Sequence, residues 1–302
     1  MNAVTEEIKQ LKKEKNAVIL AHYYVEDAVQ EIADYIGDSY YLSRLATETT
    51  ADVVVFCGVG FMGESAKVLN PGKKVLMPDM SADCPMAHMA DIAGIEKLRA
   101  EYEDLAVVCY INSTAELKAH ADVCVTSSNA LKIVKALPNK HILFIPDDNL
   151  GHFIAEQVPE KEFLYQNGHC PVHKAIAPEA VKKAKQEHPQ ALVLAHPEWL
   201  PEVSALADYV GSTSGIIDYA TKSDAEEFVI CTETGVFYEL KKKNPGKKFY
   251  PASAHQICPD MKKITLEKVR DVLKNESNAV TVEKELSEKS GRPLERMLEL
   301  AK

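Results

Sequence analysis

The 302-residue sequence contains no apolar run that approaches the roughly 18 residues a membrane-spanning helix needs. The N-terminal stretch MNAVTEEIKQLKKEK is a charged, amphipathic helix pattern that lacks the apolar core of a signal peptide. Basic residues are in the minority, with 35 Lys and Arg against 45 Asp and Glu and a formal net charge of −10. This charge argues against nucleic acid or an anionic membrane as the main partner, although a local pocket can still attract anionic substrates. We therefore expect a cytoplasmic protein that binds neither nucleic acid nor membrane.

The seven cysteines do not form the even, dense set that indicates a disulfide framework. Four lie in or beside apolar, strand-like runs and are interpreted as small buried hydrophobic side chains: Cys57, Cys109, Cys124 and Cys231. The other three stand in loops and are each followed directly by proline, in DCPM, HCPV and ICPD: Cys84, Cys170 and Cys258. We call these three the loop cysteines.

The loop cysteines are 86 and 88 residues apart, and other landmarks repeat with nearly the same steps. Ala-Asp pairs occur at 33–34, 121–122 and 207–208. Three apolar runs each end at a polar or aromatic residue, and a Ser or Thr lies 17 positions after that residue. The pairs are His22 and Ser39, Tyr110 and Ser127, and His196 and Thr213. Landmarks that keep this step three times indicate an internal triplication.

Each repeat alternates continuous apolar runs with amphipathic helix patterns, which is typical of a parallel sheet covered on both faces. The predicted fold class is α/β, with three pseudo-symmetric, small three-layer α/β/α domains whose parallel sheets surround a central site. We assign residues 1–86, 87–171 and 172–259 to the three repeats. Residues 260–302 hold two helix patterns that do not repeat, and we expect this C-terminal extension to pack back on the repeats.

Ligands of parallel sheets bind beyond the carboxyl ends of the strands, and the landmark residues fall there. Three similar domains with converging strand ends would place the three loop cysteines around one axis. Three thiolates suit an iron–sulfur cube with one open iron, and a tetrahedral zinc ion with one water needs similar ligands. His173, three residues after Cys170, makes a zinc-like pair, but neither other repeat has this histidine. The residues alone leave both metals open.

The Ser and Thr residues that follow the strand ends also have two interpretations. Each could simply cap the helix that it begins. A helix N-terminus also binds carboxylate or phosphate, and three of them around one cavity would suit a small, multiply charged anion. Glu198 lies between Pro197 and Trp199, where a carboxylate is expensive to bury without a partner or a task. We therefore expect Glu198 at the same rim as His22 and His196.

Longer motifs around these landmarks resemble the quinolinate synthase family over nearly the whole chain. They are ILAHYY at 19–24, GDS at 37–39, DCPMAHM at 83–89, YINST at 110–114, TSSNA at 126–130, NGHCPVH at 167–173, AHPEW at 195–199, GSTSG at 211–215 and RPLERMLEL at 292–300. The resemblance implies one 4Fe–4S cluster with three cysteine ligands and one open iron. It also implies the condensation of iminoaspartate (iminosuccinate) with dihydroxyacetone phosphate to quinolinate, with loss of phosphate and two waters, in de novo NAD biosynthesis. A functional link to an L-aspartate oxidase or an aspartate dehydrogenase is a further implication.

The resemblance also assigns roles to individual positions. The implied cluster ligands are Cys84, Cys170 and Cys258. The implied substrate contacts are His22, Ser39, Tyr110, Asn112, Ser127, His196, Glu198 and Thr213, and the implied catalytic residues are Tyr24, Tyr110, His196 and Glu198. Some family members carry Cys-x-x-Cys-x-x-Cys at the third cysteine position, whereas this chain has only Cys258 there. We therefore expect no redox switch at that position.

Two other functions remain as alternatives. One is a metabolite-binding iron–sulfur redox sensor, and the other is a zinc-dependent lyase that acts on a small phosphorylated acid. A sensor needs an output element, and the sequence shows no helix-turn-helix, basic stripe or appended domain. The composition of the bound metal separates the zinc lyase from the other two.

Overall fold

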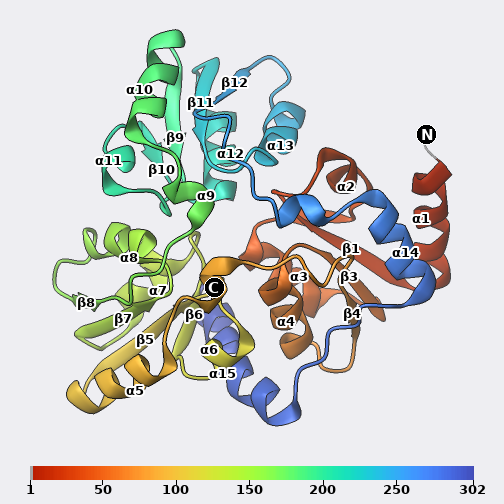
Figure 1. Cartoon of the computed structure of the whole chain (residues 1–302), viewed down its shortest axis with the longest axis horizontal. Helices are drawn as coiled ribbons and strands as arrows, with labels where there is room; N and C mark the ends of the chain where they lie inside the picture. Colours follow the sequence, from red (N-terminus) through yellow and green to blue (C-terminus); the bar gives the residue numbers. More distant parts are fainter. Residues whose placement is uncertain (1–2) are drawn as a thin grey trace.

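A computed structural model describes residues 3–302 and shows three units and a C-terminal extension (Figure 1). The first unit contains α1 (Ala3–Glu14), β1 (Ala17–His22), α2 (Asp27–Ile32), β2 (Tyr35–Gly37), α3 (Ser39–Glu48), β3 (Val53–Cys57), α4 (Gly60–Leu69) and β4 (Lys74–Leu76). The second contains the 3₁₀ helix η1 (Pro85–His88), α5 (Ile92–Glu101), β5 (Leu105–Tyr110), α6 (Ala115–Lys118), β6 (Val123–Val125), α7 (Ala130–Ala136), β7 (His141–Ile145), α8 (Asp148–Ala155) and β8 (Glu162–Leu164).

The third unit contains α9 (Pro171–Lys174), α10 (Pro178–Glu187), β9 (Leu192–Ala195), α11 (Pro201–Ser204), β10 (Tyr209–Val210), α12 (Thr213–Lys222), β11 (Glu227–Cys231), α13 (Val236–Lys243) and β12 (Lys248–Pro251). The extension contains the 3₁₀ helix η2 (Met261–Lys263), α14 (Leu266–Asn275) and α15 (Lys284–Leu300). The domain limits assigned from the sequence stay a proposal. Two of them, at 86/87 and 171/172, fall within the short helices η1 and α9.

Each unit is built on one four-stranded parallel sheet, so the predicted α/β class with three parallel sheets is confirmed. Among residues 3–302, all three sheets have the same strand order: β2-β1-β3-β4, β6-β5-β7-β8 and β10-β9-β11-β12. Helices cover both faces of the sheets, so central strands such as β3 and β5 are buried along their whole length. Continuous apolar runs therefore form these strands, because neither face meets water.

The Ala-Asp landmarks have a hydrogen-bonding role that is repeated three times. In each unit the aspartate carboxylate accepts a hydrogen bond from a backbone N–H of the first strand of the sheet: Asp34 from Ile19 (2.8 Å), Asp122 from Val107 (2.7 Å) and Asp208 from Val193 (2.8 Å). The aspartate N–H donates back to the carbonyl of the same strand residue. The carboxylate thus fixes the start of the second strand beside the first.

A second repeated contact involves the lysine before the last strand of each sheet. Its ammonium donates to carbonyls at the C-terminal end of the helix between the second and third strands of the sheet: Lys73 to Ala46 of α3, Lys161 to Leu137 at the end of α7, and Lys247 to Ala220 of α12. A cation at this place satisfies carbonyls that the helix leaves unpaired and opposes the helix dipole. The triplication therefore extends from sequence spacing to the bonds that end the helices.

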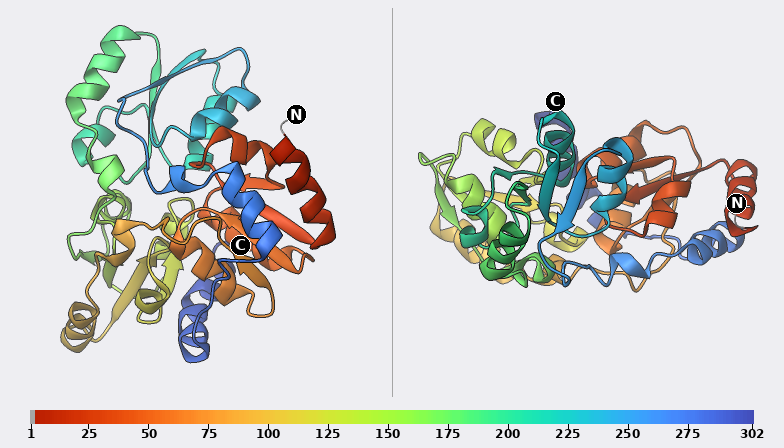
Figure 2. Two further views of the ribbon diagram at one scale, coloured as in Figure 1. Left: turned by 45° about the vertical axis from the view of Figure 1, so that its right-hand side comes forward. Right: turned by 90° about the horizontal axis from the view of Figure 1, so that it is seen from above.

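The two long helices of the C-terminal extension pack on two of the three units, and its Lys262 pairs with Glu233 of the third unit at 3.0 Å. Helix α14 packs against α1, α2 and β3, whereas α15 packs against α4, α6, β6 and α7. Figure 2 (right) shows the end of α15 on the upper face of the molecule and α14 on the lower face. One continuous cluster of buried apolar side chains runs through the first unit, the second unit and the extension, while the third unit has clusters of its own. Among residues 3–302, no helix has the length and apolarity to cross a bilayer.

Candidate functional site

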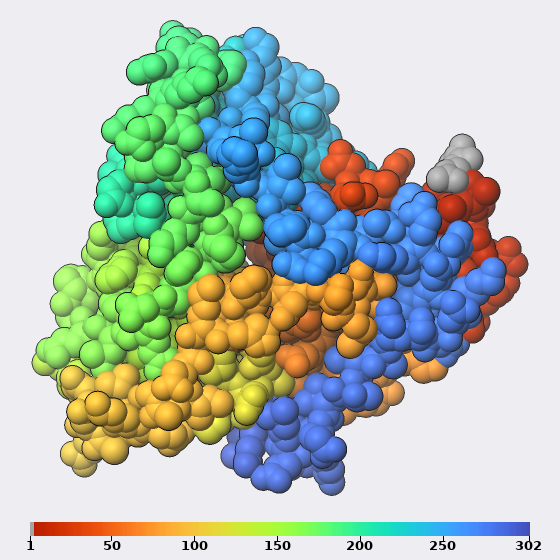
Figure 3. Space-filling model, viewed as in Figure 1, coloured from red at the N-terminus to blue at the C-terminus, as the bar shows by residue number. Residues whose placement is uncertain are grey.

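The carboxyl ends of the three sheets face one central cavity of about 120 Å³. The three units meet at a hollow in the space-filling view (Figure 3). Every site residue predicted from the sequence lines this cavity: His22, Tyr24, Ser39, Cys84, Tyr110, Asn112, Ser127, Cys170, His196, Glu198, Thr213 and Cys258. We call it the inner cavity. The shared position of these residues follows from the triplication, because equivalent strands end at equivalent places around it.

His22 and His196 hold equivalent places and are buried, with exposed fractions of 5% and 3%. The Nδ1 atom of each ring accepts a hydrogen bond from the backbone N–H two residues later, at 3.2 Å from Tyr24 and 3.4 Å from Glu198. This assignment leaves the proton of a neutral ring on Nε2. Burial lowers the pKa of His22 to about 3 and the pKa of His196 to about 4. Both rings are therefore neutral hydrogen-bond donors near pH 7.

Glu198 is 4% exposed, and two different side chains hold its carboxylate. The hydroxyl of Tyr110 donates to Oε1, and Nδ1 of His173 lies 2.8 Å from Oε2. Burial alone would raise the pKa of Glu198, but His173, His196 and the hydrogen bond from Tyr110 together hold this pKa below its usual value. Glu198 is therefore ionised near neutral pH and can accept a proton.

Tyr24 links the first unit to the third across the inner cavity. Its hydroxyl lies 2.6 Å from the hydroxyl of Thr232 and 2.8 Å from that of Thr213. Burial raises the pKa of Tyr24 well above its ordinary value. Tyr24 therefore stays protonated and can donate a proton or a hydrogen bond.

The Ser and Thr residues at the helix starts are not the residues whose side chains cap the helices. The caps of α3 and α12 belong to Asp38 and Ser212, which accept hydrogen bonds from the N–H groups of Tyr41 and Gly215. The hydroxyl residues that line the inner cavity are Ser39, Ser127 and Thr213. Asn112 also lines it, and its buried Oδ1 has no hydrogen-bond partner within the described part of the chain. An unpaired buried acceptor in a cavity indicates a place for a ligand donor.

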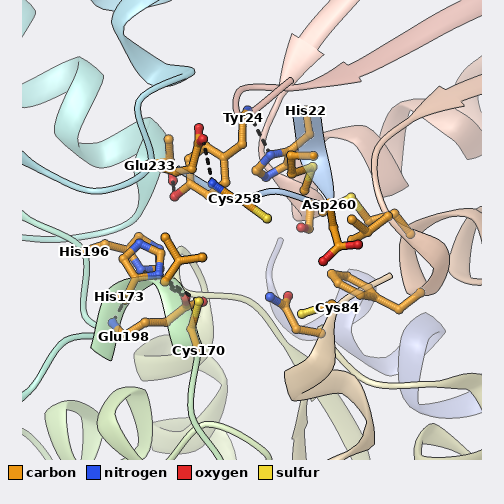
Figure 4. A pocket seen from close by; sticks show the side chains of 18 of the residues that line it. His22, Tyr24, Cys84, Cys170, His173, His196, Glu198, Glu233, Cys258 and Asp260 are labelled. Atoms are coloured by element: carbon orange, nitrogen blue, oxygen red, sulfur yellow. Dashed lines mark hydrogen bonds and ion pairs between the residues drawn. The ribbon is translucent and has the colours of Figure 1, made fainter. Parts of the chain in front are cut away.

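The three loop cysteines approach the inner cavity from three different loops, and their sulfur atoms point into the same space (Figure 4). A proline at the first position of the following short helix stiffens two of these loops, at Pro85 and Pro171. Burial raises the pKa of all three thiols, so they are neutral in the metal-free protein. Metal binding here would therefore release protons.

The spacing of the donor atoms distinguishes two kinds of metal site. Among residues 3–302, one group of three donors is compact: Cys170, His173 and Glu198 place donor atoms within 4.8 Å of one another. The three loop cysteines do not form such a group. Two thiolates on one zinc ion must lie within about 4.6 Å, twice the Zn–S bond length. The wider spacing of the three thiols suits a larger group that contains several metal atoms.

His173 was not among the residues predicted for the site, yet it is central to it. It is 2% exposed, and its Nδ1 lies 3.2 Å from Sγ of Cys170 as well as near Glu198. Its Nε2 lies 3.0 Å from the hydroxyl of Thr232, which in turn contacts Tyr24. The sequence signal was the Cys-x-x-His spacing, which the other two repeats do not share.

Two buried carboxylates beneath the cysteine loops were also missed. Asp147 accepts a hydrogen bond from the backbone N–H of Cys170 (3.1 Å), and Glu233 accepts one from that of Cys258 (3.1 Å). Both lie 37 residues after the polar end of the first strand, a phase that the sequence could have revealed. The first repeat has Val59 at this phase, which hides the pattern.

Comparison with known families agrees with this arrangement. The sequence model of the family described as "Quinolinate synthetase A protein" matches residues 6–299. The chain belongs to this family. A relative named quinolinate synthase from Caldicellulosiruptor saccharolyticus is 52% identical over 298 residues, which cover 99% of this chain and 98% of the relative. Relatives of the same name from Clostridioides difficile and Aquifex aeolicus are 53% identical over 298 residues and 50% identical over 300 residues. These alignments cover 99% and 98% of this chain, and 98% and 93% of the relatives.

Membership of the quinolinate synthetase A protein family agrees with the resemblance seen in the sequence motifs. The matched residues include all three loop cysteines and the polar end of the first strand in each sheet. The similarity therefore extends over the whole inner cavity rather than over one unit.

Proposed function

We propose that this chain is a quinolinate synthase of de novo NAD biosynthesis. It condenses iminoaspartate with dihydroxyacetone phosphate and forms quinolinate, phosphate and two waters. One observation carries the proposal: in a chain of this family, motif residues from three separate units all line one buried cavity. The volume of about 120 Å³ suits substrates of few atoms.

We further propose that Cys84, Cys170 and Cys258 hold one 4Fe–4S cluster and leave one iron open. Two observations support a cluster over a single zinc ion: the three thiols face one space, and they are not as close as zinc requires. When bound, the cluster supplies a Lewis acid that can bind a hydroxyl or carboxylate of a substrate. Asp147 and Glu233 fix the backbone of two cysteine loops, so these loops are already ordered for metal binding.

The hydroxyl groups of Ser39, Ser127 and Thr213 bind the carboxylates and the phosphate of the substrates in this proposal. They lie at or just before the first turns of α3, α7 and α12, where backbone N–H groups and the helix dipole favour an anion. The neutral rings of His22 and His196 add Nε2–H donors, and the unpaired Oδ1 of Asn112 adds an acceptor for a hydroxyl or N–H group of a substrate. Fixing two small reactants in this way lowers the entropic part of the barrier.

We assign proton transfer to two groups whose pKa values are shifted in opposite directions from their ordinary values. Glu198 is ionised and serves as the proton acceptor, whereas Tyr24 is protonated and serves as the donor. His196 lies beside Glu198, with its Nδ1 4.0 Å from Oε2, and can exchange a proton with a bound ligand through Nε2. Tyr110 holds the carboxylate of Glu198 and hydrogen-bonds to it in the ground state.

We place the enzyme in the cytoplasm, because its seven free cysteines suit a reducing compartment. An L-aspartate oxidase or an aspartate dehydrogenase is the class of enzyme that would supply the imine substrate. Neither nucleic acid nor membrane is expected as a partner of a protein with this net charge.

The proposal is tested by anaerobic purification, followed by metal, sulfide and turnover measurements. We expect about four irons and four sulfides per chain, a brown chromophore, and quinolinate formation from iminoaspartate and dihydroxyacetone phosphate. The metal-free protein is the control and should be inactive. Stoichiometric zinc without iron, bound by Cys170, His173 and Glu198, would instead favour a zinc lyase. Iron-loaded protein that forms no quinolinate would refute the proposed activity.

A further inference from the structure

A second cavity, of about 540 Å³, lies behind the helix starts that line the inner cavity. All three units contribute to it, and so does the end of the C-terminal extension. The lining residues are Tyr23, Ile36, Asp38, Tyr40, Tyr41, Arg44, Ser128, Asn129, Lys132, Ser214, Asp218, Lys243 and Ala301. We call it the outer cavity. None of the loop cysteines lines it.

The two cavities are lined by consecutive residues at three equivalent places, which we call the shared wall. Ser39, Ser127 and Thr213 line the inner cavity, and the next residue of each segment lines the outer one: Tyr40, Ser128 and Ser214. Asp38 lines both cavities. The hydroxyl of Ser214 donates to Asp38 at 2.6 Å and thereby joins the third unit to the first across this wall. This contact between two side chains is the place where we expect the shared wall to open.

Asn129, which lines the outer cavity, carries a buried donor that lacks a partner. The residue is 5% exposed, and its Oδ1 is fixed by a hydrogen bond from the N–H of Thr126 at 2.7 Å. Its Nδ2 has no hydrogen-bond partner anywhere in residues 3–302. Buried amide donors are almost always paired, so an unpaired one beside a cavity indicates a ligand with an acceptor oxygen.

Basic side chains surround the mouth of the outer cavity. Arg44 and Lys132 are exposed and stand at equivalent positions of the first and second units, and Lys243 comes from the third. Lys132 also donates to the carbonyl of Ala301 at 3.1 Å, and Asp218 is the acidic residue at the equivalent position of the third unit. These three cations face two carboxylates in the lining, Asp38 and Asp218. Arg44 and Lys243 also lie near Glu48 (3.6 Å) and Glu239 (3.8 Å), but both basic side chains are exposed, and ion pairs of exposed side chains are weak and can exchange for a bound anion.

We infer that the outer cavity is a capture site for a small phosphate-bearing molecule and the route by which that molecule reaches the inner cavity. Asn129 and the basic residues bind the phosphate, and the molecule then crosses the shared wall to the helix starts on the other side. The identity of the ligand as the phosphorylated substrate rests on the proposed function. The loop cysteines line the inner cavity but not the outer one.

Phosphate binding to the iron-loaded protein tests the capture site without any turnover. Inorganic phosphate is the probe, measured by ³¹P NMR line broadening or calorimetry. Asn129→Asp keeps the acceptor for Thr126 but replaces the free donor with a negative charge, and we expect at least about tenfold weaker binding. Arg44→Gln, at an exposed position, should weaken binding about threefold or more. Lys135→Gln removes the same charge from exposed α7 surface outside the cavity and should leave binding unchanged.

Ser127→Ala distinguishes phosphate binding in the outer cavity from binding in the inner one, because Ser127 lines only the inner cavity. Phosphate binding that survives this change but fails in Asn129→Asp and Arg44→Gln supports the outer site. Binding that is lost in Ser127→Ala and unchanged in Asn129→Asp and Arg44→Gln would overturn it.

The entry route is tested by filling the outer cavity. Ser128 is exposed, and its hydroxyl lies 2.8 Å from that of Thr126, a contact that tryptophan and alanine remove alike, so Ser128→Ala controls for its loss. We expect Ser128→Trp to lower kcat/KM for dihydroxyacetone phosphate at least about tenfold at unchanged iron content, while Ser128→Ala changes it less than about twofold. Wild-type kcat/KM in the tryptophan variant would exclude this route. If the wild type makes no quinolinate, the proposed function fails, but the phosphate measurements still decide whether the capture site exists.

Discussion

Replacing Glu233 with valine gives the third unit the residue that the first unit has at the equivalent position, Val59. Glu233 is 1% exposed and accepts hydrogen bonds from the N–H groups of Cys258 (3.1 Å) and Gly235 (2.6 Å). Lys262 also lies 3.0 Å from its carboxylate, but this lysine is partly exposed and can turn to water. Each buried N–H left unpaired costs roughly 1–3 kcal/mol, so the loss of both hydrogen bonds should lower the stability of the third unit by about 2–6 kcal/mol.

The fluorescence of Trp199 reports on the stability of the third unit. This residue is the single tryptophan of the chain, it is 1% exposed, and it lies in the third unit. Urea unfolding followed by tryptophan fluorescence should therefore show a lower midpoint for Glu233→Val in the metal-free protein. The same variant should also lose iron faster to a chelator, because the backbone of Cys258 is no longer fixed. A fluorescence curve that superimposes on that of the wild type would refute the reasoning.

A compensating substitution provides a matched control. In the first unit the N–H of Cys84 is paired with the side chain of the preceding residue, Asp83, at 2.8 Å. The third unit has Ile257 at that position, 47% exposed. Adding Ile257→Asp to Glu233→Val should recover about 1 kcal/mol, because it restores an acceptor for one of the two orphaned N–H groups. Ile257→Asp alone should change little, since Glu233 already binds that N–H.

Three further predictions concern the site. Cys170→Ser should abolish the chromophore and turnover, whereas Cys57→Ser should cost only about 1 kcal/mol of packing; equal iron and sulfide contents in the two proteins would contradict the ligand assignment. Glu198→Gln should lower turnover about 10²-fold or more at unchanged iron content, because the proton acceptor is lost, and near-normal kcat would remove Glu198 from that role. His22 has a pKa of about 3 when folded and an ordinary value of 6.5, so the unfolded chain binds its proton more tightly and stability falls as pH drops below 6.5. Between pH 6.5 and pH 5 the loss should be roughly 2 kcal/mol, measured by urea midpoints, and His22→Asn should flatten this slope.

The parallel sheets and most of the site could be predicted because both depend on features that recur in each repeat. Aspartates such as Asp34 carry the same hydrogen bond in all three units, so the spacing of Ala-Asp records a structural constraint. His22, Tyr110 and His196 end equivalent strands for the same reason. A feature that is needed three times leaves three copies in the sequence.

The remaining residues of the site have no equivalent in at least one unit, so the repeat pattern did not predict them. His173 has no counterpart in the other units, because its partners, Cys170 and Glu198, come together only where the second and third units meet. Glu233 has a counterpart in the second unit, Asp147, but the equivalent residue of the first unit is Val59. There the N–H of the loop cysteine, Cys84, donates to Asp83 instead. The outer cavity exists only once the three units are assembled, so no local pattern encodes it.

The C-terminal extension joins two of the three repeated units into one part and leaves the third unit as the other. Because one apolar core runs through the first unit, the second unit and the extension, those parts cannot shift against one another without exposing it to water. The third unit shares with them mainly the buried ring of Tyr23. Several of its other links cross the inner cavity as hydrogen bonds: Tyr24 with Thr213 and Thr232, Ser127 with His196, and Tyr110 with Glu198. Further links join Ser214 to Asp38, Gly235 to Gln30 and Glu233 to Lys262. A molecule bound among the groups of the inner cavity competes for the same donors and acceptors that hold the third unit in place. Ligand binding at the site and the association of the third unit with the other part are therefore thermodynamically coupled.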